Sequence, residues 1–383
     1  MPTQAQQILS QLSQLVATPS VSSTSAQWDQ GNRPVIDLLA NWCENLGFTV
    51  QTMPVNDSGS KANMLATRGS GPGGLVLAGH SDTVPFDEHR WQSDPLELTE
   101  RDQRLYGLGS TDMKGFFPLA LAAAQSVADK QLAQPLMILA TADEESSMSG
   151  ARALAAQGFP KARAAVIGEP TGLRPVRMHK GIAMQSVRVV GQAGHSSNPA
   201  LGNNALEAMH GVIGDLLAFR RSLQQKYHNP LFDVAMPTMN LGCLHGGDNP
   251  NRICGEAELH FDLRLLPGTS TDAVLHDLRM RLEARAAQTG TRISTTPLIG
   301  GVEPFEQPAD SELIRIAEKL SGHRAEVVNF ATEAPYLQQL GLQTVVMGPG
   351  SIDQAHQPDE FLALDQIKPC IALLEGLIGR YCL

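Results

Sequence analysis

The chain has 383 residues, of which 42% are hydrophobic and 18% charged, and its formal net charge is −10. This length exceeds what one ordinary core buries, so two domains are expected, and the residue balance argues against extended disorder. An acidic chain without runs of Lys or Arg is a poor match for phosphate backbones, which argues against nucleic acid as a partner.

The first residues predict a helix and not a targeting segment. Ile8, Leu12 and Leu15 recur at helical spacing, and Thr3 with Gln6 forms a candidate capping box. The start of the chain lacks the basic residues and unbroken apolar stretch of a signal peptide, and no apolar run reaches the ~20 residues that span a bilayer. The five cysteines form no CxxC pair, which indicates reduced thiols. We therefore expect a cytoplasmic protein without membrane contact.

Short apolar runs alternate with a helical segment in the first half of the chain. The runs at 74–79, 135–140 and 164–168 predict buried strands, and the segment 114–128, rich in Ala, Leu and Phe, predicts a helix between the first two. This alternation predicts an α/β fold with a mostly parallel sheet and helices on both faces. In such sheets, functional sites gather at the carboxyl ends of the strands.

The pattern changes after about residue 179. The expected elements there are a strand at 182–190, a helix at 203–224, strands at 238–244 and 253–265, a helix at 271–287 and a strand near 291–295. The order β-α-β-β-α-β is that of a ferredoxin-like α+β unit. Beyond residue 297 the alternation resumes, with elements at 310–321, 325–328, 333–340 and 344–347. We expect a catalytic domain at 1–179 and 297–383 that is interrupted by an inserted domain at 180–296.

A histidine and an aspartate directly follow the first predicted strand. His80 and Asp82 stand two residues apart in AGHSDTVP, so in an extended chain they face the same way. A carboxylate that accepts one ring N–H of a histidine leaves the other nitrogen free for a metal. One HxD pair is common by chance, and a structural His–Asp contact is the alternative.

Further acidic residues occupy comparable positions, namely Asp112, Glu144, Glu145 and Glu169. Each of them alone fits a solvated loop residue. On successive strand ends they point to one rim of one sheet, where carboxylates would repel one another unless cations compensate. His356 follows the glycine-rich turn at 348–351 and is placed to bring a second imidazole to this rim.

This combination of residues predicts a metal centre. Mixed imidazole and carboxylate ligands suit Zn²⁺, and Co²⁺ or Mn²⁺ could substitute. Two divalent cations and a bridging hydroxide would balance the charge of the candidate ligands, which are His80, Asp112, Glu145, Glu169 and His356. Metals about 3.5–4 Å apart can hold a hydroxide and polarise a carbonyl together.

Signatures of other enzyme classes are weak. The chain contains no HExxH and no GxSxG. Residues 69–74 (GSGPGG) match GxGxxG, but they include a proline and precede a strand instead of opening a helix. They therefore predict a turn and not a nucleotide site.

Six stretches resemble the M20 family of metallopeptidases and amidohydrolases and follow one another in the family's order. They are AGHSDTVP, YGLGSTDMKGF, ATADEE, IGEPT, GHSSNP and AHQPDE, and the resemblance that they carry extends over essentially the whole chain. The resemblance implies a zinc-peptidase-like catalytic domain, an inserted dimerisation lid, and a homodimer. It also implies a pair of metal ions, with His80 and Glu169 on one, Glu145 and His356 on the other, and Asp112 bridging.

The same resemblance assigns roles around the metals. It implies that Glu144 is the general base for a metal-activated water, that Asp82 orients the first histidine ligand, and that His195 stabilises the tetrahedral intermediate. Arg264 and Asn251 match positions that hold the carboxylate end of the substrate. Without the resemblance, His195 fits a surface loop histidine, and Arg264 fits a paired or solvated charge.

Three stretches narrow the expected substrate: VPFDEHRW, EVVNFATEAPY and GPGSIDQAHQPDE. They are most similar to the branch of the family that deacetylates N2-acetyl-L-ornithine, which releases L-ornithine and acetate in arginine biosynthesis. Glu333, in the second stretch, is placed to meet an ammonium on the substrate, and a carboxylate at a helix N-terminus is the alternative.

Two other functions stay open at this point. A related acyl-amino-acid hydrolase, such as succinyl-diaminopimelate desuccinylase, would need an additional basic partner for the carboxylate of the acyl group. A catalytically inactive relative that binds a partner is disfavoured, because all the expected ligands and Glu144 are present.

Overall fold

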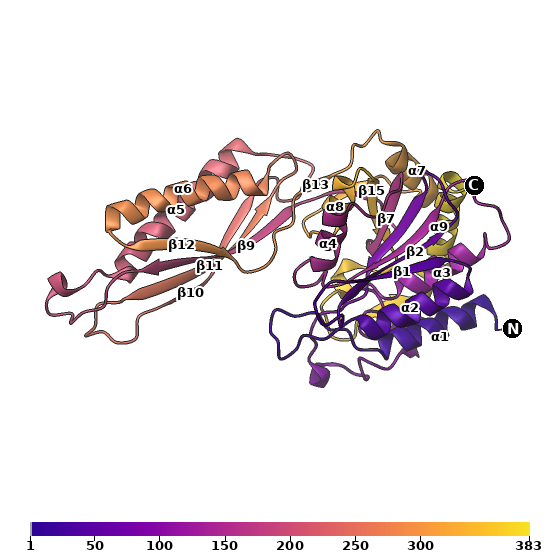
Figure 1. Ribbon diagram of the computed structural model, residues 1–383, viewed down its shortest axis with the longest axis horizontal. Helices are drawn as coiled ribbons and strands as arrows, with labels where there is room; N and C mark the ends of the chain where they lie inside the picture. The colour runs from indigo at the N-terminus through magenta and orange to yellow at the C-terminus, as the bar shows by residue number, and fades with distance from the viewer. Residues whose placement is uncertain (1) are drawn as a thin grey trace. The chain divides into compact units, whose positions relative to one another are not determined.

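The computed structural model describes residues 2–383 and divides into two compact units (Figure 1). Unit 1 comprises the chain up to Arg177 together with Gln307–Glu326 and Thr332–Leu383, and unit 2 comprises Met178–Glu306 and Val327–Ala331. Unit 2 therefore interrupts unit 1 in the sequence. The chain returns to unit 1 at Gln307, whereas the prediction placed this return at residue 297.

Unit 1 is built on a sheet with parallel strands at its centre. The strand order is β1 (Thr49–Pro54), β2 (Ala62–Arg68), β6 (Leu136–Thr141), β3 (Leu75–His80), β7 (Ala164–Pro170) and β15 (Gln343–Gly348). The neighbours β6, β3, β7 and β15 are parallel, while β1 and β2 form an antiparallel edge. The predicted α/β class with parallel central strands is confirmed, and the sheet as a whole is mixed.

Helices cover both faces of this sheet. One face carries α1 (Gln4–Val16), α2 (Arg33–Asn45), α3 (Phe116–Gln125), α7 (Glu312–Ser321) and α9 (Ile367–Tyr381), whose side chains share one core cluster with the strands. On the other face, α4 (Ser149–Gln157) and α8 (Ala334–Gln339) contact each other, and α8 contacts β15 (Figure 1). The predicted capping box of α1 is present, with Thr3 and Gln6 bonded reciprocally.

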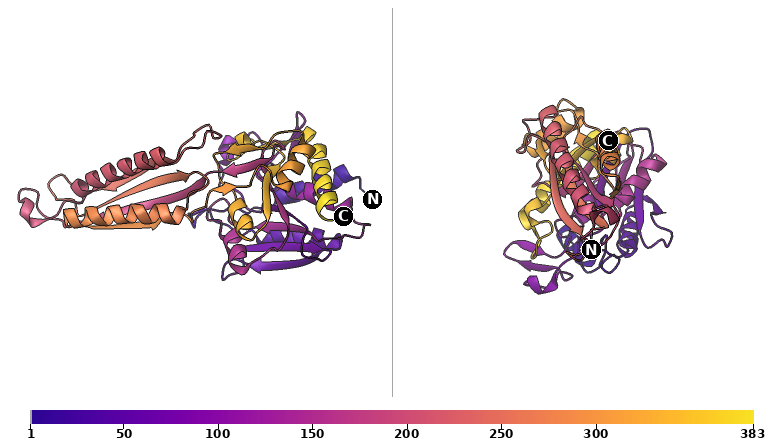
Figure 2. Two further views of the ribbon diagram at one scale, coloured as in Figure 1. Left: turned by 90° about the horizontal axis from the view of Figure 1, so that it is seen from above. Right: turned by 90° about the vertical axis from the view of Figure 1, so that its left-hand side faces the viewer.

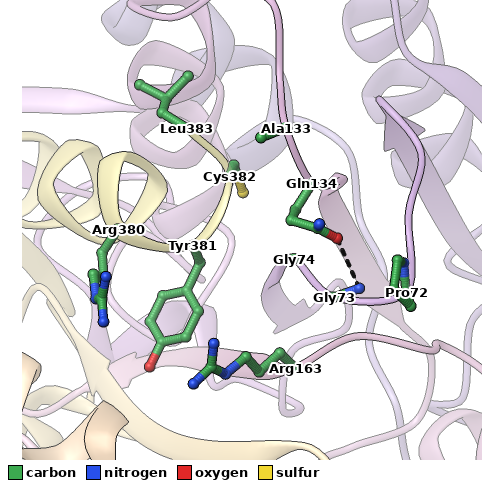
Figure 3. A pocket seen from close by; sticks show the side chains of 10 residues that line it. All are labelled: Pro72, Gly73, Gly74, Ala133, Gln134, Arg163, Arg380, Tyr381, Cys382 and Leu383. Carbon is green, nitrogen blue, oxygen red and sulfur yellow. Dashed lines mark hydrogen bonds between the residues drawn. The ribbon is translucent and has the colours of Figure 1, made fainter.

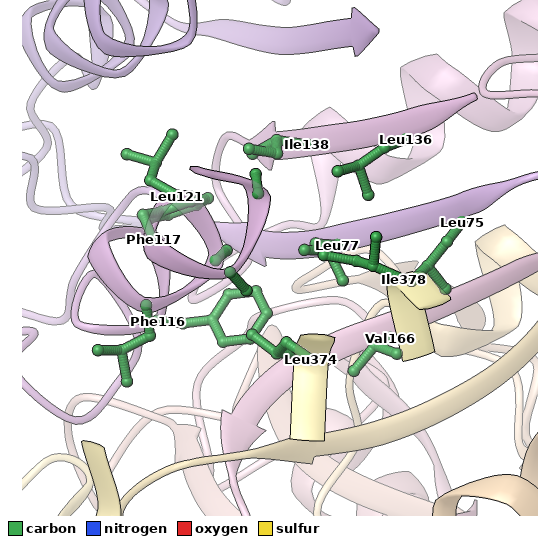
Figure 4. Close-up of a cluster of buried hydrophobic side chains, with 14 of the residues drawn as sticks. Leu75, Leu77, Phe116, Phe117, Leu121, Leu136, Ile138, Val166, Leu374 and Ile378 are labelled. Atoms are coloured by element: carbon green, nitrogen blue, oxygen red, sulfur yellow. The ribbon is translucent and has the colours of Figure 1, made fainter. Parts of the chain in front are cut away.

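The core of unit 1 follows from strands that are apolar on both sides. Leu75 and Leu77 of β3 face the cluster that contains Phe116 and Phe117 of α3 and Leu374 of α9 (Figure 4). All of these side chains are buried, and β3, β6 and β7 are buried along their whole length. A strand covered on both faces reads as a continuous apolar run, which is why these three were visible in the sequence.

Smaller elements complete unit 1. A three-stranded antiparallel sheet has the order β16 (Phe361–Ala363), β5 (Arg104–Tyr106), β4 (Thr99–Arg101). Short 3-10 helices are η1 (Glu88–Arg90), η3 (Ile352–Gln354) and η4 (Leu364–Gln366). Strand β8 (Val176–His179) crosses the boundary between the units, and so does β14 (Glu326–Val328). No helix within residues 2–383 is both long and apolar enough to cross a membrane.

Unit 2 has the element order that the sequence predicted. It runs β9 (Gly181–Val190), α5 (Ala205–Lys226), β10 (Thr238–Gly246), β11 (Glu256–Leu265), α6 (Thr271–Thr289) and β12 (Arg292–Pro297), with η2 (Pro199–Leu201) before α5 and β13 (Phe305–Glu306) at its end. The sheet order is β10-β11-β9-β12, and every pair is antiparallel.

One face of the unit 2 sheet is covered by α5 and α6, which run alongside each other (Figure 2). Burial alternates along β11, with Leu259, Phe261 and Leu263 buried in a cluster that includes Phe219 of α5. This alternation is the pattern of a sheet with one packed face.

Candidate metal centre

The candidate site lies in unit 1 at the carboxyl ends of its central strands. His80 is the last residue of β3, Glu169 belongs to the end of β7, and Glu144 and Glu145 follow β6. Because β3 pairs in parallel with both β6 and β7, with His80 opposite Thr141, these residues meet at one edge of the sheet. The structure therefore brings His80, Glu144, Glu145 and Glu169 together at this edge.

Asp112 lies between the two histidines of this rim. Its Oδ1 is 3.1 Å from Nε2 of His80, and its Oδ2 is 3.6 Å from Nε2 of His356. Nε2 of His356 is also 3.0 Å from Oε2 of Glu145, and Nε2 of His80 is 3.9 Å from Oε1 of Glu169. One carboxylate that offers an oxygen to each of two histidines has the geometry that a bridging ligand needs.

The donor atoms form two overlapping groups. Among residues 2–383, atoms of His80, Glu144 and Glu169 lie within 4.8 Å of one another, and so do atoms of His80, Asp112 and Glu145. Imidazole nitrogens and carboxylate oxygens in such groups are the ligands that zinc and related divalent ions take. The residues present therefore fit a pair of divalent cations.

The electrostatics of the cluster reflect this crowding of carboxylates. Burial, together with the charge of neighbouring carboxylates, raises the pKa values of Glu144 and Glu169 well above their usual range. The pKa of His80 is raised well above its usual value in spite of its burial, because Asp112 accepts its hydrogen bond and Glu169 lies nearby. The hydrogen bond to Glu145 raises the pKa of His356 to about 9. A site that holds this much negative charge favours cations.

Asp82 contacts His80 mainly through its main-chain oxygen, while its carboxylate bonds to the main chain of Glu145. Nδ1 of His80 is 3.0 Å from the main-chain oxygen of Asp82, whereas the carboxylate Oδ1 is 3.8 Å away. The carboxylate Oδ2 instead accepts a hydrogen bond of 3.1 Å from the main-chain N–H of Glu145. Strand β3 ends at His80, two residues before Asp82. Asp82 still connects two predicted ligands, one through its carbonyl and one through its carboxylate.

Glu360 is a buried residue of the site region that the sequence reasoning did not single out. Its side chain accepts hydrogen bonds from the main-chain N–H groups of Gly109, Thr111 and Asp112, at 3.0, 2.7 and 2.9 Å. These bonds tie the turn that carries Asp112 to the segment that carries His356. A signal was available, because Glu360 closes the AHQPDE motif, but its partners are main-chain groups that no side-chain pattern reveals.

Glu333 lies within unit 1, enclosed beside the carboxylate cluster. It is 2% exposed, and its Oε2 accepts a hydrogen bond of 2.9 Å from the hydroxyl of Thr141 at the end of β6. Although Glu333 is the first residue before α8, its side chain makes no capping bond there. Burial raises its pKa to about 7. Its predicted contact with a substrate ammonium stays a prediction.

The remaining predicted residues belong to unit 2. His195 and Asn251 lie on adjacent loops, where the main-chain N–H of Ser196 bonds to the oxygen of Asn251 at 3.0 Å. Nδ1 of His195 is 2.8 Å from the hydroxyl of Ser197. Arg264, on β11, donates to Asp262 at 2.8 Å. The roles predicted for His195, Asn251 and Arg264 stay predictions.

A different pocket of unit 1 contains none of the predicted site residues (Figure 3). It is lined by the turn at 72–74 and by the end of α9, and Gln134 accepts a hydrogen bond of 2.9 Å from the N–H of Gly73 there. The guanidinium groups of Arg163 and Arg380 that border it are both paired with Glu312. Because both guanidinium groups are already paired with Glu312, this pocket is a weaker candidate for a catalytic or binding site than the cluster at the strand ends.

Comparisons with known proteins agree with this geometry. The family model described as peptidase family M20/M25/M40 matches residues 76–380. Acetylornithine deacetylase of Edwardsiella ictaluri (strain 93-146) is 49% identical over 382 residues, which covers 100% of both chains. Acetylornithine deacetylase of Pasteurella multocida (strain Pm70) is 48% identical over 374 residues, which covers 98% of both.

Solved structures share the fold at lower identity. An M20 family metallo-carboxypeptidase from Sulfolobus solfataricus has a TM-score of 0.74 at 20% identity, covering 97% of this chain and 98% of that one. A dinuclear metal binding peptidase of the M20 family from Bacillus subtilis has a TM-score of 0.68 at 15% identity, covering 98% and 97%. The chain belongs to the M20/M25/M40 peptidase family.

Proposed function

We propose that this chain hydrolyses N2-acetyl-L-ornithine to L-ornithine and acetate, as a step of arginine biosynthesis in the cytoplasm. The observation that carries the proposal is the 49% identity, over the full length of both chains, to a relative named acetylornithine deacetylase. A match of this extent includes both units and every predicted site residue. The resemblance of VPFDEHRW, EVVNFATEAPY and GPGSIDQAHQPDE to the same branch supports the same substrate.

We infer that the cluster holds two divalent metal ions, zinc by preference, with cobalt as a substitute. His80 and Glu169 would hold one ion, Glu145 and His356 the other, and Asp112 would bridge them. The support is the mixed donor set and the placement of the two Asp112 oxygens toward different histidines. When bound, such a pair lowers the pKa of water and polarises a carbonyl group.

Glu144 would act as the general base. Its carboxylate would take the proton of the attacking water and pass it to the departing amine. Burial and the neighbouring Glu169 raise the pKa of the Glu144 carboxyl group above its usual range. Asp82 would keep His80 in the tautomer whose Nε2 is free, since Nδ1 faces the carbonyl of Asp82.

Residues of unit 2 would complete the site. We propose that the protein is a homodimer in which His195 donates a hydrogen bond to the developing oxyanion, while Arg264 and Asn251 hold the carboxylate of the substrate. Arginine can donate two parallel hydrogen bonds to a carboxylate, and Arg264 at present donates one, from Nε to Asp262. An amide side chain such as that of Asn251 can add a further donor.

A substrate comparison tests the proposed function. Purified metal-loaded protein would be assayed with N2-acetylornithine, N-acetylmethionine and succinyl-diaminopimelate. We expect kcat/KM for N2-acetylornithine to exceed that for succinyl-diaminopimelate by more than about tenfold, the scale of one unmatched polar contact. An equal or reversed preference would move the chain to the desuccinylase branch. Absence of hydrolysis with metal bound would favour the inactive, partner-binding alternative.

A further inference from the structure

The segment 84–91 has no role in the proposed mechanism. Its sequence, VPFDEHRW, is one of the three stretches that resemble the branch of the family that deacetylates N2-acetyl-L-ornithine. It follows directly on the turn that carries His80 and Asp82 and contains η1. The N–H of Gln92 at its end donates to Oδ1 of Asp359 at 2.8 Å, which ties it to the segment that carries His356. The end of the stretch is therefore tied to the loop that carries His356.

A small pocket separates this segment from His356. One side is formed by His356 and its neighbours, and the other by the segment itself. The imidazole of His356 is 55% exposed, so a predicted metal ligand borders the pocket directly. The lining residues that matter here are Phe86, Asp87, Arg90, Trp91, Leu108 and His356.

The walls of the pocket combine apolar surface with one carboxylate, of Asp87, and one guanidinium, of Arg90. Phe86, Trp91 and Leu108 supply apolar atoms, and such surface suits the methylene groups of an extended side chain. Asp87 supplies the negative charge, and its side chain is 64% exposed. Its ion pair with Arg90 spans 3.9 Å, and the Arg90 side chain is 61% exposed, so the pair is loose. A loose, exposed ion pair contributes little and can be exchanged for another cation.

We propose that Asp87 binds the ammonium group of the substrate side chain and that the methylene groups of this side chain lie against Phe86 and Trp91. The inference rests on the proposed function, since it names the group that selects the amino acid. The enclosed carboxylate of Glu333 is 2% exposed, whereas Asp87 presents its carboxylate to solvent beside a predicted metal ligand. A charge-assisted hydrogen bond of this kind discriminates a substrate that has the ammonium from one that lacks it.

The test uses two substrates that differ only in the amine. N2-acetylornithine and N-acetylnorvaline carry the same three-carbon side chain, and only the first has the terminal ammonium. For the metal-loaded wild type we expect kcat/KM to favour N2-acetylornithine. Asp87→Asn should lower this preference by about tenfold, the range of a hydrogen bond to a charged group, with turnover of N-acetylnorvaline kept within about twofold. The retained turnover shows that the variant folds and holds its metals.

Glu88→Gln provides the matched control. Glu88 is the adjacent exposed acid and does not line this pocket, so its loss changes the net charge equally and should leave the preference unaltered. An equal effect of both substitutions would indicate only long-range attraction and would overturn the contact. Loss of turnover on both substrates with Asp87→Asn would make Asp87 a structural residue and would overturn it too.

Three further outcomes would overturn this inference, and they leave the proposed function to its own test. If the wild type prefers N2-acetylornithine and Glu333→Gln, but not Asp87→Asn, removes that preference, the contact belongs to Glu333 and only the present inference fails. If the wild type cleaves both substrates equally well, no ammonium contact contributes and this inference fails, whereas the proposed function fails only if N2-acetylornithine is not preferred to succinyl-diaminopimelate or is not cleaved. N-acetylglutamate is the anionic comparison. If it were cleaved best, and if Arg90→Gln removed that preference, the pocket would bind an anionic side chain through Arg90 and the inference would be wrong.

Discussion

Two neighbouring glutamates show how position alone separates chemical roles at the residue scale. Glu145 lies 3.0 Å from His356, while Glu144 groups with His80 and Glu169. The two side chains are chemically identical, but the turn that follows β6 gives them different partners. The sequence could predict that both belong to the rim, and only the resemblance to the family could separate a ligand from a base.

Substitution of each glutamate by glutamine should therefore give opposite phenotypes. Glu144→Gln should keep metal content and lose about 10²–10⁴-fold in kcat, because an amide cannot accept the proton. Glu145→Gln should lower metal content, because an amide is a weaker ligand than a carboxylate. Elemental analysis and kcat measured on the same samples check both. Loss of metal in Glu144→Gln, with normal turnover per bound metal, would exchange the two roles.

At the scale of elements, the sequence predicted the strands and the helix that are apolar along their whole length, and it missed a strand of mixed polarity. The buried strands β3, β6 and β7 and the helix α3 were visible as continuous apolar runs. The edge strand β1 was not, because its positions alternate between exposed and partly buried and only Met53 is fully buried. Glu360 was missed for a related reason: it acts through three main-chain N–H groups, and main-chain partners leave no trace in side-chain periodicity.

The packing of α3 against β7 makes Gly168 essential at its position, one residue before Glu169. A Cβ added to Gly168 would lie 2.2 Å from the ring of Phe116 in α3. Because both elements are buried, neither can move without disturbing the core, and such overpacking typically costs about 1–3 kcal/mol. The steric demand therefore links the core to a predicted metal ligand.

Gly168→Ala should lower the free energy of unfolding by about 1–3 kcal/mol and also weaken metal binding through displacement of Glu169. Gly379→Ala is the control, since an added Cβ there meets nothing within 4 Å and Gly379 lies inside α9. That change should be neutral or stabilise by up to about 1 kcal/mol, because alanine favours helix. Urea denaturation of the metal-free proteins measures both, and equal stabilities of the two variants would refute the clash.

At the scale of the whole molecule, the ligands come from distant parts of the chain. His80 and Glu169 precede unit 2 in the sequence, and His356 follows it, yet all three lie in unit 1. Cations that bind this cluster would connect segments on both sides of the insertion. A ligand that binds only the folded state stabilises it, so metal content should govern stability as well as activity.

Dialysis against a strong chelator should abolish hydrolysis and lower the melting temperature. The reason is that carboxylates gathered at one rim repel one another once the cations are gone. Zn²⁺ or Co²⁺ added back should restore both properties, while Mg²⁺, which prefers oxygen ligands, should restore them less well. Activity and thermal unfolding would be recorded on the same samples with elemental analysis. Full activity in protein shown to be free of metal would exclude the metal mechanism.

The predicted homodimer has a consequence for His195, which belongs to unit 2 while every predicted metal ligand belongs to unit 1. The family resemblance implies that each subunit lends this histidine to its neighbour's site. Loss of one donor to a developing oxyanion typically costs about 10²–10³-fold in rate. Glu144→Ala and His195→Ala should thus each be nearly inactive as homodimers, for different reasons.

Refolding the two variants together tests whether His195 acts in trans. A mixed dimer would contain one subunit with an intact Glu144, and the neighbour of that subunit would supply an intact His195. One complete site forms in each mixed dimer, and random pairing makes about half of the dimers mixed, so activity should recover to roughly a quarter of wild type. If His195 acts within its own subunit, every site still lacks one essential group and no activity returns. Absence of recovery, with mixed dimers demonstrated by native mass spectrometry, would confine His195 to its own subunit or remove it from catalysis.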